Sequence, residues 1–297
     1  MKIVVTGATG FIANAIVERL LDEGHQVYVI TRPQTDTSKL ADNIEVFTDT
    51  GDTKFLNDFF QEVQPDGVLH LASLVLVGHT LDDIEPLIIS NILFSTRLLE
   101  ASVNAKVSWF INTGTFWQNY NNEEYNPVNL YAATKQAFED ISKYYYETNK
   151  INFVTIKLND TFGANDTRSK IFNLWGRAVT NQENLGMSPG EQVIDISYIE
   201  NIIDAYMLLL TQLQNDKNNL YAGEVYAINS DERMTLKELS KVYEEVTNTK
   251  VDITWGGRDY RDREVMLPWD QGKPVPGWKQ KISLRDAIAT VMNKGKE

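Results

Sequence analysis

The chain of 297 residues contains no cysteine and only three histidines. Without cysteine it can form neither disulfides nor thiolate metal sites, and this absence fits a reducing compartment. His25, His70 and His79 lack the spacing of metal ligands. Cations are also in deficit, because 28 Lys and Arg stand against 41 Asp and Glu, which gives a net charge of −13. Bulk charge therefore argues against binding to nucleic acid or to an anionic membrane.

Long apolar runs are missing as well. No stretch of about 18 uninterrupted apolar residues occurs, and residues 1–5 lead directly into Thr6 and Gly7 without a secretory pattern. We therefore expect a cytoplasmic protein without a membrane span. Apolar residues make up 42% of the chain, including 12 Phe and 13 Tyr, which is enough for a sizeable core.

Short β-branched runs alternate with helical patterns in the first half of the chain. This order predicts an α/β fold, a doubly wound parallel sheet of the Rossmann type with right-handed crossovers. Strands are expected at residues 2–6, 26–31, 44–47, 67–72, 107–112, 152–158 and 224–228. Helices are expected at residues 11–23, 53–63, 82–105, 129–149, 169–182, 199–213, 236–247 and 283–294.

The second half of the chain is less regular and predicts a smaller lobe. Residues 1–160 are expected to form a dinucleotide-binding domain, and residues 161–297 mainly a substrate-binding lobe. Segments near 192–230 can return to the sheet, so this boundary is soft. The segment 255–278 contains Gly, Pro, Trp and alternating charges, and it is expected to be irregular and to lie over a site.

A glycine-containing turn joins the first expected strand to the first helix, in the stretch Thr6-Gly7-Ala8-Thr9-Gly10-Phe11-Ile12-Ala13. Gly7 permits a tight turn, Gly10 lets the backbone approach a ligand, and Ala13 lets the helix pack on the strand. The amide groups and the dipole at the helix N-terminus favour a diphosphate. The sequence therefore predicts a dinucleotide site formed by Gly7, Thr9, Gly10, Phe11 and Ile12.

The end of the second strand indicates which dinucleotide is bound. NAD sites usually place Asp or Glu there, whereas this chain has Ile30-Thr31-Arg32. Arg32 can pair with a 2′-phosphate, so the sequence favours NADP(H), with NAD(H) as the other possibility. In the alternative interpretation Arg32 is a solvated loop cation and Asp36 reaches the ribose.

Tyr131 and Lys135 are spaced by about one turn within the helix expected at 129–149. This spacing puts the phenol and the ammonium on one face. A nearby cation lowers the pKa of a phenol, so Tyr131 can act as a general acid or base near neutral pH. Upstream, the strand at 107–112 leads into Thr113 and Thr115, and a hydroxyl at a strand end can bond a substrate oxygen. We predict that Tyr131, Lys135 and one of these threonines are catalytic.

These motifs resemble the extended short-chain dehydrogenases/reductases of the NAD-dependent epimerase/dehydratase family over nearly the whole chain. The resemblance includes His70-Leu71-Ala72-Ser73, the stretch that opens at Asn91 and the segment 195–201. It implies cofactor contacts from residues after the fourth strand and from the catalytic helix. These are Leu71, Ala72, Ser73, Asn91, Tyr131 and Lys135.

The family pattern also bears on the catalytic hydroxyl and on the reaction. It places the hydroxyl four residues before an aromatic, which selects Thr113 by way of Trp117, with Thr115 as the second candidate. Dehydratases of the family carry an Asp-Glu pair directly after the catalytic threonine. This chain has Gly114-Thr115 there, so no acid is placed to expel water.

Two stretches, 112–118 and 260–266, resemble the synthases of CDP-linked 3,6-dideoxyhexoses, of the CDP-abequose and CDP-paratose type. This resemblance implies the NADPH-dependent reduction of the 4-keto group of a CDP-linked deoxyhexose, in deoxysugar or lipopolysaccharide biosynthesis. A nucleotide-sugar 4-epimerase that retains NAD is the alternative. A redox-sensing regulator of the same fold is disfavoured, because such proteins often lose the catalytic tyrosine.

The same resemblance implies the substrate contacts. Arg261 is expected to bind the sugar diphosphate, with Arg263 as the alternative, because a guanidinium can pair with such an anion through two hydrogen bonds. The expected substrate-binding residues are Thr115, Asp160, Arg168, Lys170 and Arg261. The helices at 82–105 and 129–149 are further expected to form a homodimer interface, as in many family members.

Overall fold

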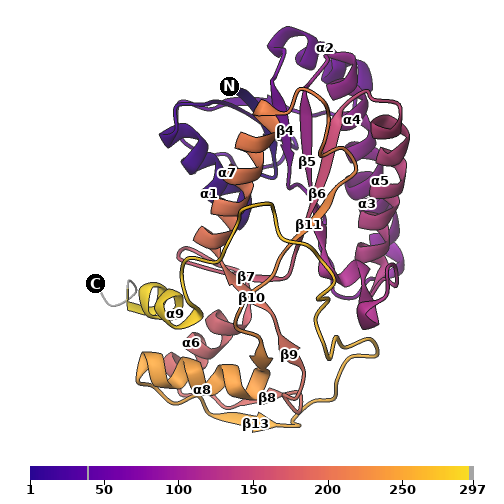
Figure 1. The fold of residues 1–297 in the computed structure, drawn as a ribbon. Helices are drawn as coiled ribbons and strands as arrows, with labels where there is room; N and C mark the ends of the chain where they lie inside the picture. The colour runs from indigo at the N-terminus through magenta and orange to yellow at the C-terminus, as the bar shows by residue number, and fades with distance from the viewer. Residues whose placement is uncertain (39, 294–297) are drawn as a thin grey trace.

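The computed structural model describes residues 1–38 and 40–293, and within these ranges seven parallel strands form a central sheet (Figure 1). Its order is β11-β6-β5-β4-β1-β2-β3. The strands are β1 (Lys2–Thr6), β2 (Gln26–Thr31), β3 (Glu45–Thr48), β4 (Gly67–His70), β5 (Trp109–Thr115), β6 (Asn152–Leu158) and β11 (Val225–Ile228). The order reverses between β1 and β4, which leaves a crevice for a ligand at the carboxyl ends of these strands. The predicted Rossmann-type fold is confirmed.

Helices cover both faces of the sheet (Figure 1). On one face lie α1 (Phe11–Asp22) and α7 (Ile199–Asn215), and on the other lie α2 (Thr53–Val63), α4 (Phe94–Asn104) and α5 (Leu130–Glu147). Successive strand residues point to opposite faces, so Ile3 and Val5 pack with the first set while Val4 packs with the second. Burial on both faces explains why the strands read as continuous apolar runs.

The segment predicted as one helix at 82–105 is interrupted. It consists of the 3-10 turn η1 (Leu81–Asp83), α3 (Ile84–Ile88), the π-helical turn η2 (Ile89–Leu93) and α4. A π-helical turn inserts an extra residue and often occurs at functional sites. Here it carries Asn91, whose buried side chain donates to Thr134 Oγ1 on α5 at 2.9 Å.

A smaller lobe lies beyond the carboxyl ends of the strands (Figure 1). Its helices are α6 (Ile171–Asn181), α8 (Leu236–Thr247) and α9 (Leu284–Asn293). Short strands pair as β7 (Asp160–Phe162) with β10 (Ile196–Tyr198), β8 (Leu185–Met187) with β13 (Ile253–Trp255), and β9 (Val193–Ile194) with β12 (Met234–Thr235). These strands were not predicted, because two or three residues are too few to show a periodic pattern. After the lobe's β10, α7 and β11 rejoin the sheet, where β11 pairs with β6.

Strand β5 continues three residues beyond its predicted end at residue 112. Thr113, Gly114 and Thr115 pair with residues 156–158 of β6, so the strand ends at Thr115. A Cβ at Gly114 would lie 2.9 Å from the Glu139 carboxylate, so glycine lets this side chain approach the strand closely. None of the helices in the described part of the chain has both the length and the apolar composition of a membrane span.

Candidate active site

The turn between β1 and α1 has the geometry of a dinucleotide-binding loop. Gly7 has a φ of +78°, and a Cβ there would lie 2.8 Å from the backbone nitrogen of Ala72, so only glycine is accommodated. The Gly10 amide donates to the Gly7 carbonyl at 2.8 Å and closes the turn. Among the described residues, none caps the first turn of α1 with its side chain. The loop therefore fits the diphosphate of a nicotinamide dinucleotide.

Other residues predicted to bind the cofactor lie along the same edge of the sheet. Thr9 is exposed, and Phe11 and Ile12 form the start of α1. Residues 71–73 follow β4 directly, and Ala72 packs against Gly7. Arg32 is exposed immediately after β2. Because β1, β2 and β4 are parallel neighbours, these residues surround one crevice.

Asn91 was expected to contact the cofactor, but its side chain is already fully bonded within the protein. Its Oδ1 accepts from the Ser73 hydroxyl at 3.1 Å and from the Leu74 amide at 2.8 Å. Its Nδ2 donates to the Leu74 carbonyl at 3.0 Å and to Thr134. These bonds join the loop after β4 to α5 through Asn91, and its contact with the cofactor stays a prediction.

Tyr131 and Lys135 lie on the first two turns of α5, which begins after the N-cap Asn129. Both are buried, with 8% and 2% of their surfaces exposed. Burial raises the pKa of Tyr131 to about 12, while hydrogen bonds from Ser73 and Thr115 act in the opposite direction. The predicted lowering of this pKa was wrong, because the loss of hydration outweighs the other effects. Tyr131 is therefore protonated at neutral pH.

The two candidate threonines face different partners. The Thr115 side chain lies close enough to the Tyr131 hydroxyl to lower the pKa of that phenol, whereas the Thr113 hydroxyl bonds to the Tyr206 hydroxyl on α7 at 2.7 Å. The family pattern had selected Thr113. Both threonines lie within β5, where Thr113 is partly exposed and Thr115 is buried at the end of the strand, so both stay candidates for the catalytic hydroxyl.

Lys135 is a buried cation with few charged neighbours. Burial lowers its pKa to about 8, and the nearby Glu139 carboxylate raises it. On the other side lies His70, whose pKa burial and Lys135 hold well below its usual value. His70 is thus neutral, with its ring nitrogens bonded to Thr6 and Ser95 at 2.8 Å each. Lys135 can therefore carry the positive charge at the bottom of the site.

A cavity of about 460 Å³ lies between the carboxyl end of the sheet and the lobe. Trp117 lines it and contacts the Tyr131 ring edge-on, with the ring centroids 6.2 Å apart. From the lobe side, Asp160, Arg261 and Arg263 line the same cavity. The cavity therefore connects the catalytic helix to the residues expected to bind a diphosphate.

The predicted substrate cations differ in how they are held. Arg168 is not at the cavity, because its guanidinium lies 4.4 Å from the centroid of the Phe11 ring and bonds to Asp166 at 2.7 Å. Lys170 bonds to Asp160 at 2.8 Å at the edge of the cavity. Arg261 is exposed and forms no ion pair with any residue in the described ranges.

The segment 256–278 crosses from the lobe back to the sheet beside the cavity, and it is largely irregular as expected. Arg263 stacks 4.3 Å from the centroid of the Tyr120 ring and bonds to Asn126. Further on, the Asp270 amide donates to Asn122 at 3.0 Å. These contacts tie the segment to the loop after β5. They also engage Arg263, which leaves Arg261 as the more available of the two arginines.

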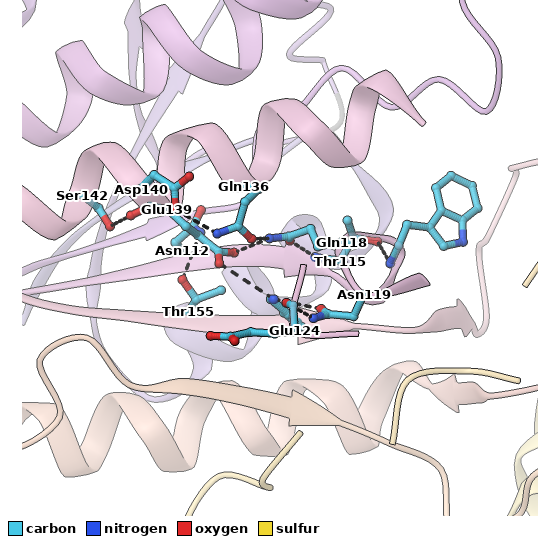
Figure 2. A network of polar contacts seen from close by, with 12 residues as sticks. Asn112, Thr115, Gln118, Asn119, Glu124, Gln136, Glu139, Asp140, Ser142 and Thr155 are labelled. Atoms are coloured by element: carbon cyan, nitrogen blue, oxygen red, sulfur yellow. Dashed lines mark hydrogen bonds and ion pairs between the residues drawn. The ribbon is translucent and has the colours of Figure 1, made fainter. Parts of the chain in front are cut away.

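A polar network that no sequence motif predicted lies behind the site (Figure 2). Gln118, in the 3-10 turn η3 (Phe116–Gln118), links the end of β5 to α5. Its side chain bonds to the Thr115 amide, to Gln136 and to Glu139. The one available signal was the spacing of Tyr131, Lys135 and Glu139, which repeats every four residues on one helix face.

A family model described as the NAD dependent epimerase/dehydratase family matches residues 3–228. The chain belongs to the NAD-dependent epimerase/dehydratase family. This membership confirms the resemblance inferred from the motifs and the prediction of an NAD(P)-dependent enzyme of this family. The dinucleotide loop and the Tyr131–Lys135 pair lie within the matched residues.

Individual relatives cover almost the whole chain. CDP-abequose synthase from Yersinia pseudotuberculosis is 29% identical over 272 residues, which span 90% of this chain and 92% of the relative. CDP-abequose synthase from Salmonella muenchen is 26% identical over 296 residues, which span 98% and 97%. Among solved structures, UDP-glucose 4-epimerase from Thermotoga maritima with UDP-glucose has a TM-score of 0.86 at 20% identity and covers 100% of this chain and 99% of its own. This last likeness shows the fold.

Proposed function

We propose that the protein catalyses the NADPH-dependent reduction of the 4-keto group of a CDP-linked deoxyhexose, in deoxysugar biosynthesis of the O-antigen type. The observation that carries the proposal is Tyr131, a phenol that is protonated at neutral pH and lies beside the cavity with Lys135 one turn away. Reduction of a ketone needs a proton donor in this place. The relatives named CDP-abequose synthase support the choice of sugar nucleotide.

Each catalytic side chain has a distinct task in this proposal. A nicotinamide dinucleotide, with its diphosphate held by the loop at Gly7, would supply the hydride. Tyr131 gives its proton to the oxygen of the former ketone as negative charge develops there. Thr115 donates a hydrogen bond to that oxygen or to the resulting phenolate, and Lys135 stabilises the phenolate and holds the nicotinamide ribose.

The absence of a suitably placed acid supports reduction over dehydration. Gly114 and Thr115 follow Thr113, and Phe116 and Trp117 follow Thr115, so neither threonine precedes the Asp-Glu pair of the family's dehydratases. Glu139 approaches the strand at Gly114, but its carboxylate is bonded to Gln118. No carboxylate of β5 or η3 is therefore available to expel water from the sugar.

Arg32 supports NADPH as the cofactor, because it is exposed at the strand end where a 2′-phosphate would lie. Asp36 follows in the same loop and accepts a bond from the Ser38 amide at 2.9 Å. On the substrate side, we propose that Arg261 binds the diphosphate, with Lys170 and Asp160 at the edge of the cavity. Arg168 supports the start of α1 instead.

The proposal is tested by mixing the purified protein with a CDP-4-keto-deoxyhexose and NADPH. We expect the NADPH absorbance to fall and one equivalent of the reduced sugar nucleotide to form. The second candidate is a nucleotide-sugar 4-epimerase, which the structural likeness to UDP-glucose 4-epimerase favours. Release of NAD on denaturation, with no NADPH consumption, would favour that reaction and contradict ours.

We also propose that the protein is a homodimer that pairs through the helical segments 82–105 and 129–149, which include α3, η2, α4 and α5. Large apolar side chains are exposed on and next to the first segment: Leu81 in η1, directly before it, is 84% exposed, and Ile89 and Leu93 in η2 are 48% and 50% exposed. Such a helical apolar stripe is costly to leave in water. Light scattering should give twice the mass of 33.8 kDa for one chain, and the double variant Leu81→Lys/Ile89→Lys should give a monomer.

A further inference from the structure

The catalytic helix carries a third buried polar group. Tyr131, Lys135 and Glu139 follow one another at intervals of four residues on α5, so they form one stripe on the helix. The Glu139 side chain is 10% exposed. Burying a carboxylate is costly unless it is paired and hydrogen-bonded. The contacts that compensate this cost lead directly to the catalytic hydroxyl.

Gln118 connects Glu139 to Thr115 (Figure 2). Its Nε2 donates to Glu139 Oε1 at 3.0 Å and to Gln136 Oε1 at 2.8 Å. Since an ionised carboxylate only accepts hydrogen bonds, Glu139 fixes which end of the amide faces it. The other end, Oε1, therefore faces the Thr115 amide and accepts from it at 2.9 Å. Glu139 thus sets the orientation of the group that holds the end of β5.

The same contact orients the Thr115 hydroxyl. Thr115 and Gln118 form a capping box around η3, in which the Thr115 oxygen accepts from backbone amides of that turn. The bond from the Trp117 amide is 3.3 Å long. A hydroxyl whose oxygen accepts from the turn keeps its hydrogen for another acceptor. That hydrogen is available to the Tyr131 oxygen or to the substrate.

Glu139 also lies between two buried cations. Lys157 on β6 approaches it at 3.9 Å and donates to Asn119 at 2.9 Å. Lys135 lies one turn away on α5 and is raised in pKa by the Glu139 charge. The remaining charged group near Glu139 is Asp140, on the exposed side of the helix. Glu139 is therefore the buried carboxylate whose charge opposes the desolvation of both lysines.

We propose that Glu139 and Gln118 are positioning residues of the active site, in which Gln118 aims the Thr115 hydroxyl at Tyr131 and the Glu139 carboxylate, one turn from Lys135 on α5, is the buried counter-charge of that lysine. This inference rests on the proposed roles of Tyr131, Thr115 and Lys135. The inference has two separable parts, since Gln118 orients the Thr115 hydroxyl and Glu139 supplies a negative charge near Lys135. Variants of the two residues should therefore give different signatures.

The first experiment tests the effect of the Glu139 charge. NADPH binding is measured through the cofactor's fluorescence at a series of pH values, with NADH used instead if it binds more tightly. Binding should weaken at high pH as Lys135 loses its proton, with a midpoint set by its pKa of about 8. In Glu139→Gln the midpoint should fall by roughly one pH unit, because an opposing charge has been removed. The matched control is Asp140→Asn, which removes an exposed carboxylate from the next position and should leave the midpoint unchanged.

The second arm measures the orientation with Gln118→Met, which keeps the volume and removes the amide. We expect kcat to fall by roughly tenfold while KM for the sugar nucleotide stays within about twofold. The amide of Thr115 should exchange its hydrogen faster, and the pH midpoint of cofactor binding should match the wild type. Conservative rescue by Gln118→Glu is not expected, because two carboxylates would then face each other.

A Glu139→Gln midpoint that equals the wild-type value would overturn the role of the charge. Unchanged Thr115 exchange, or an unchanged kcat, in Gln118→Met would overturn the role of the amide. Failure of the proposed function looks different. A wild-type protein that binds NADPH with the expected pH midpoint but reduces no CDP-4-keto-deoxyhexose would refute the reaction and still leave both binding and exchange readouts in place.

Discussion

The sheet half and the lobe differ in how their polar groups are paired. At the carboxyl end of the sheet, the turn after β1 and the first turn of α1 present backbone amides toward the crevice. In the lobe, cations already hold carboxylates, as Arg168 holds Asp166 and Lys170 holds Asp160. The crevice beside α1 is thus preorganised for an anion, whereas two cations of the lobe are already paired with carboxylates.

The strength of each ion pair decides which of the two cations can leave its carboxylate. The side chains of Lys170 and Asp160 are 40% and 34% exposed, and such a pair contributes only about 0–1 kcal/mol. Asp166 is 3% exposed and bonds Arg168 through both oxygens, so Arg168 stays in place. We therefore expect changes in the sheet half to act on kcat and changes in the lobe to act on KM or on stability.

The largest expected effect is that of Tyr131→Phe, which removes the proton donor. We expect kcat to fall by about 10²–10⁴-fold, while the melting temperature and NADPH affinity stay close to the wild type. Steady-state rates from NADPH absorbance and a thermal melt check this prediction. A variant that retained near wild-type kcat would show that Tyr131 does not donate the proton. The expected difference in kcat effects between the sheet half and the lobe would then be wrong.

The next effect separates the two threonines of β5. Thr115→Val should lower kcat by roughly 10- to 100-fold, because it removes the hydroxyl that faces Tyr131. Thr113→Val should instead leave the buried Tyr206 hydroxyl without its partner and lower the free energy of unfolding by about 1–3 kcal/mol. Kinetics and urea unfolding of both variants give the answer. The reverse pattern would restore the family's assignment of Thr113.

In the lobe, Arg261→Ala should raise KM for the sugar nucleotide by roughly tenfold, the worth of one charge-assisted bond. Arg168→Ala is the matched control, since it removes an arginine that is held away from the cavity. It should leave KM nearly unchanged and lower the melting temperature, because buried Asp166 loses its partner. Equal effects of the two variants on KM would contradict the proposal that Arg261, and not Arg168, binds the substrate.

The smallest expected effect concerns the cofactor. Arg32→Ala should weaken NADPH binding several-fold and leave NADH binding unchanged, because an exposed cation contributes modestly to a phosphate contact. Fluorescence titration with both cofactors measures the ratio of the two affinities. If the ratio of NADPH to NADH affinity is the same in the variant as in the wild type, a group other than Arg32 contacts the 2′ position of the ribose. Asp36 would then be the next residue to test.

Much of the fold could be predicted because its signals are local. The expected helices at 53–63 and 236–247 coincide with α2 and α8, and the expected strands at 2–6 and 26–31 coincide with β1 and β2. Each of these elements carries its own periodicity and end signals. The short strands of the lobe could not be predicted, because their pairing is decided by partners far away in the chain.

The site shows the same division. Gly7, Tyr131 and Lys135 could be found from spacing, because one turn and one helix hold each motif together. The choice between Thr113 and Thr115 could not, because the length of β5 is set by its pairing with β6. The motifs predicted Asn91 at the cofactor and Arg168 at the substrate, and in the structure both side chains bond to neighbouring protein groups.

The sequence by itself determined the alternation of strands and helices, the dinucleotide loop and the phenol–ammonium pair, since each rests on patterns among residues close in the chain. Only the tertiary structure decided that Tyr131 keeps its proton, that Thr115 faces it and that Glu139 stands behind both. Those outcomes depend on burial and on hydrogen-bond partners that strand pairing and helix packing bring together from distant segments. Desolvation and partner choice are properties of the assembled core, and no local pattern encodes them.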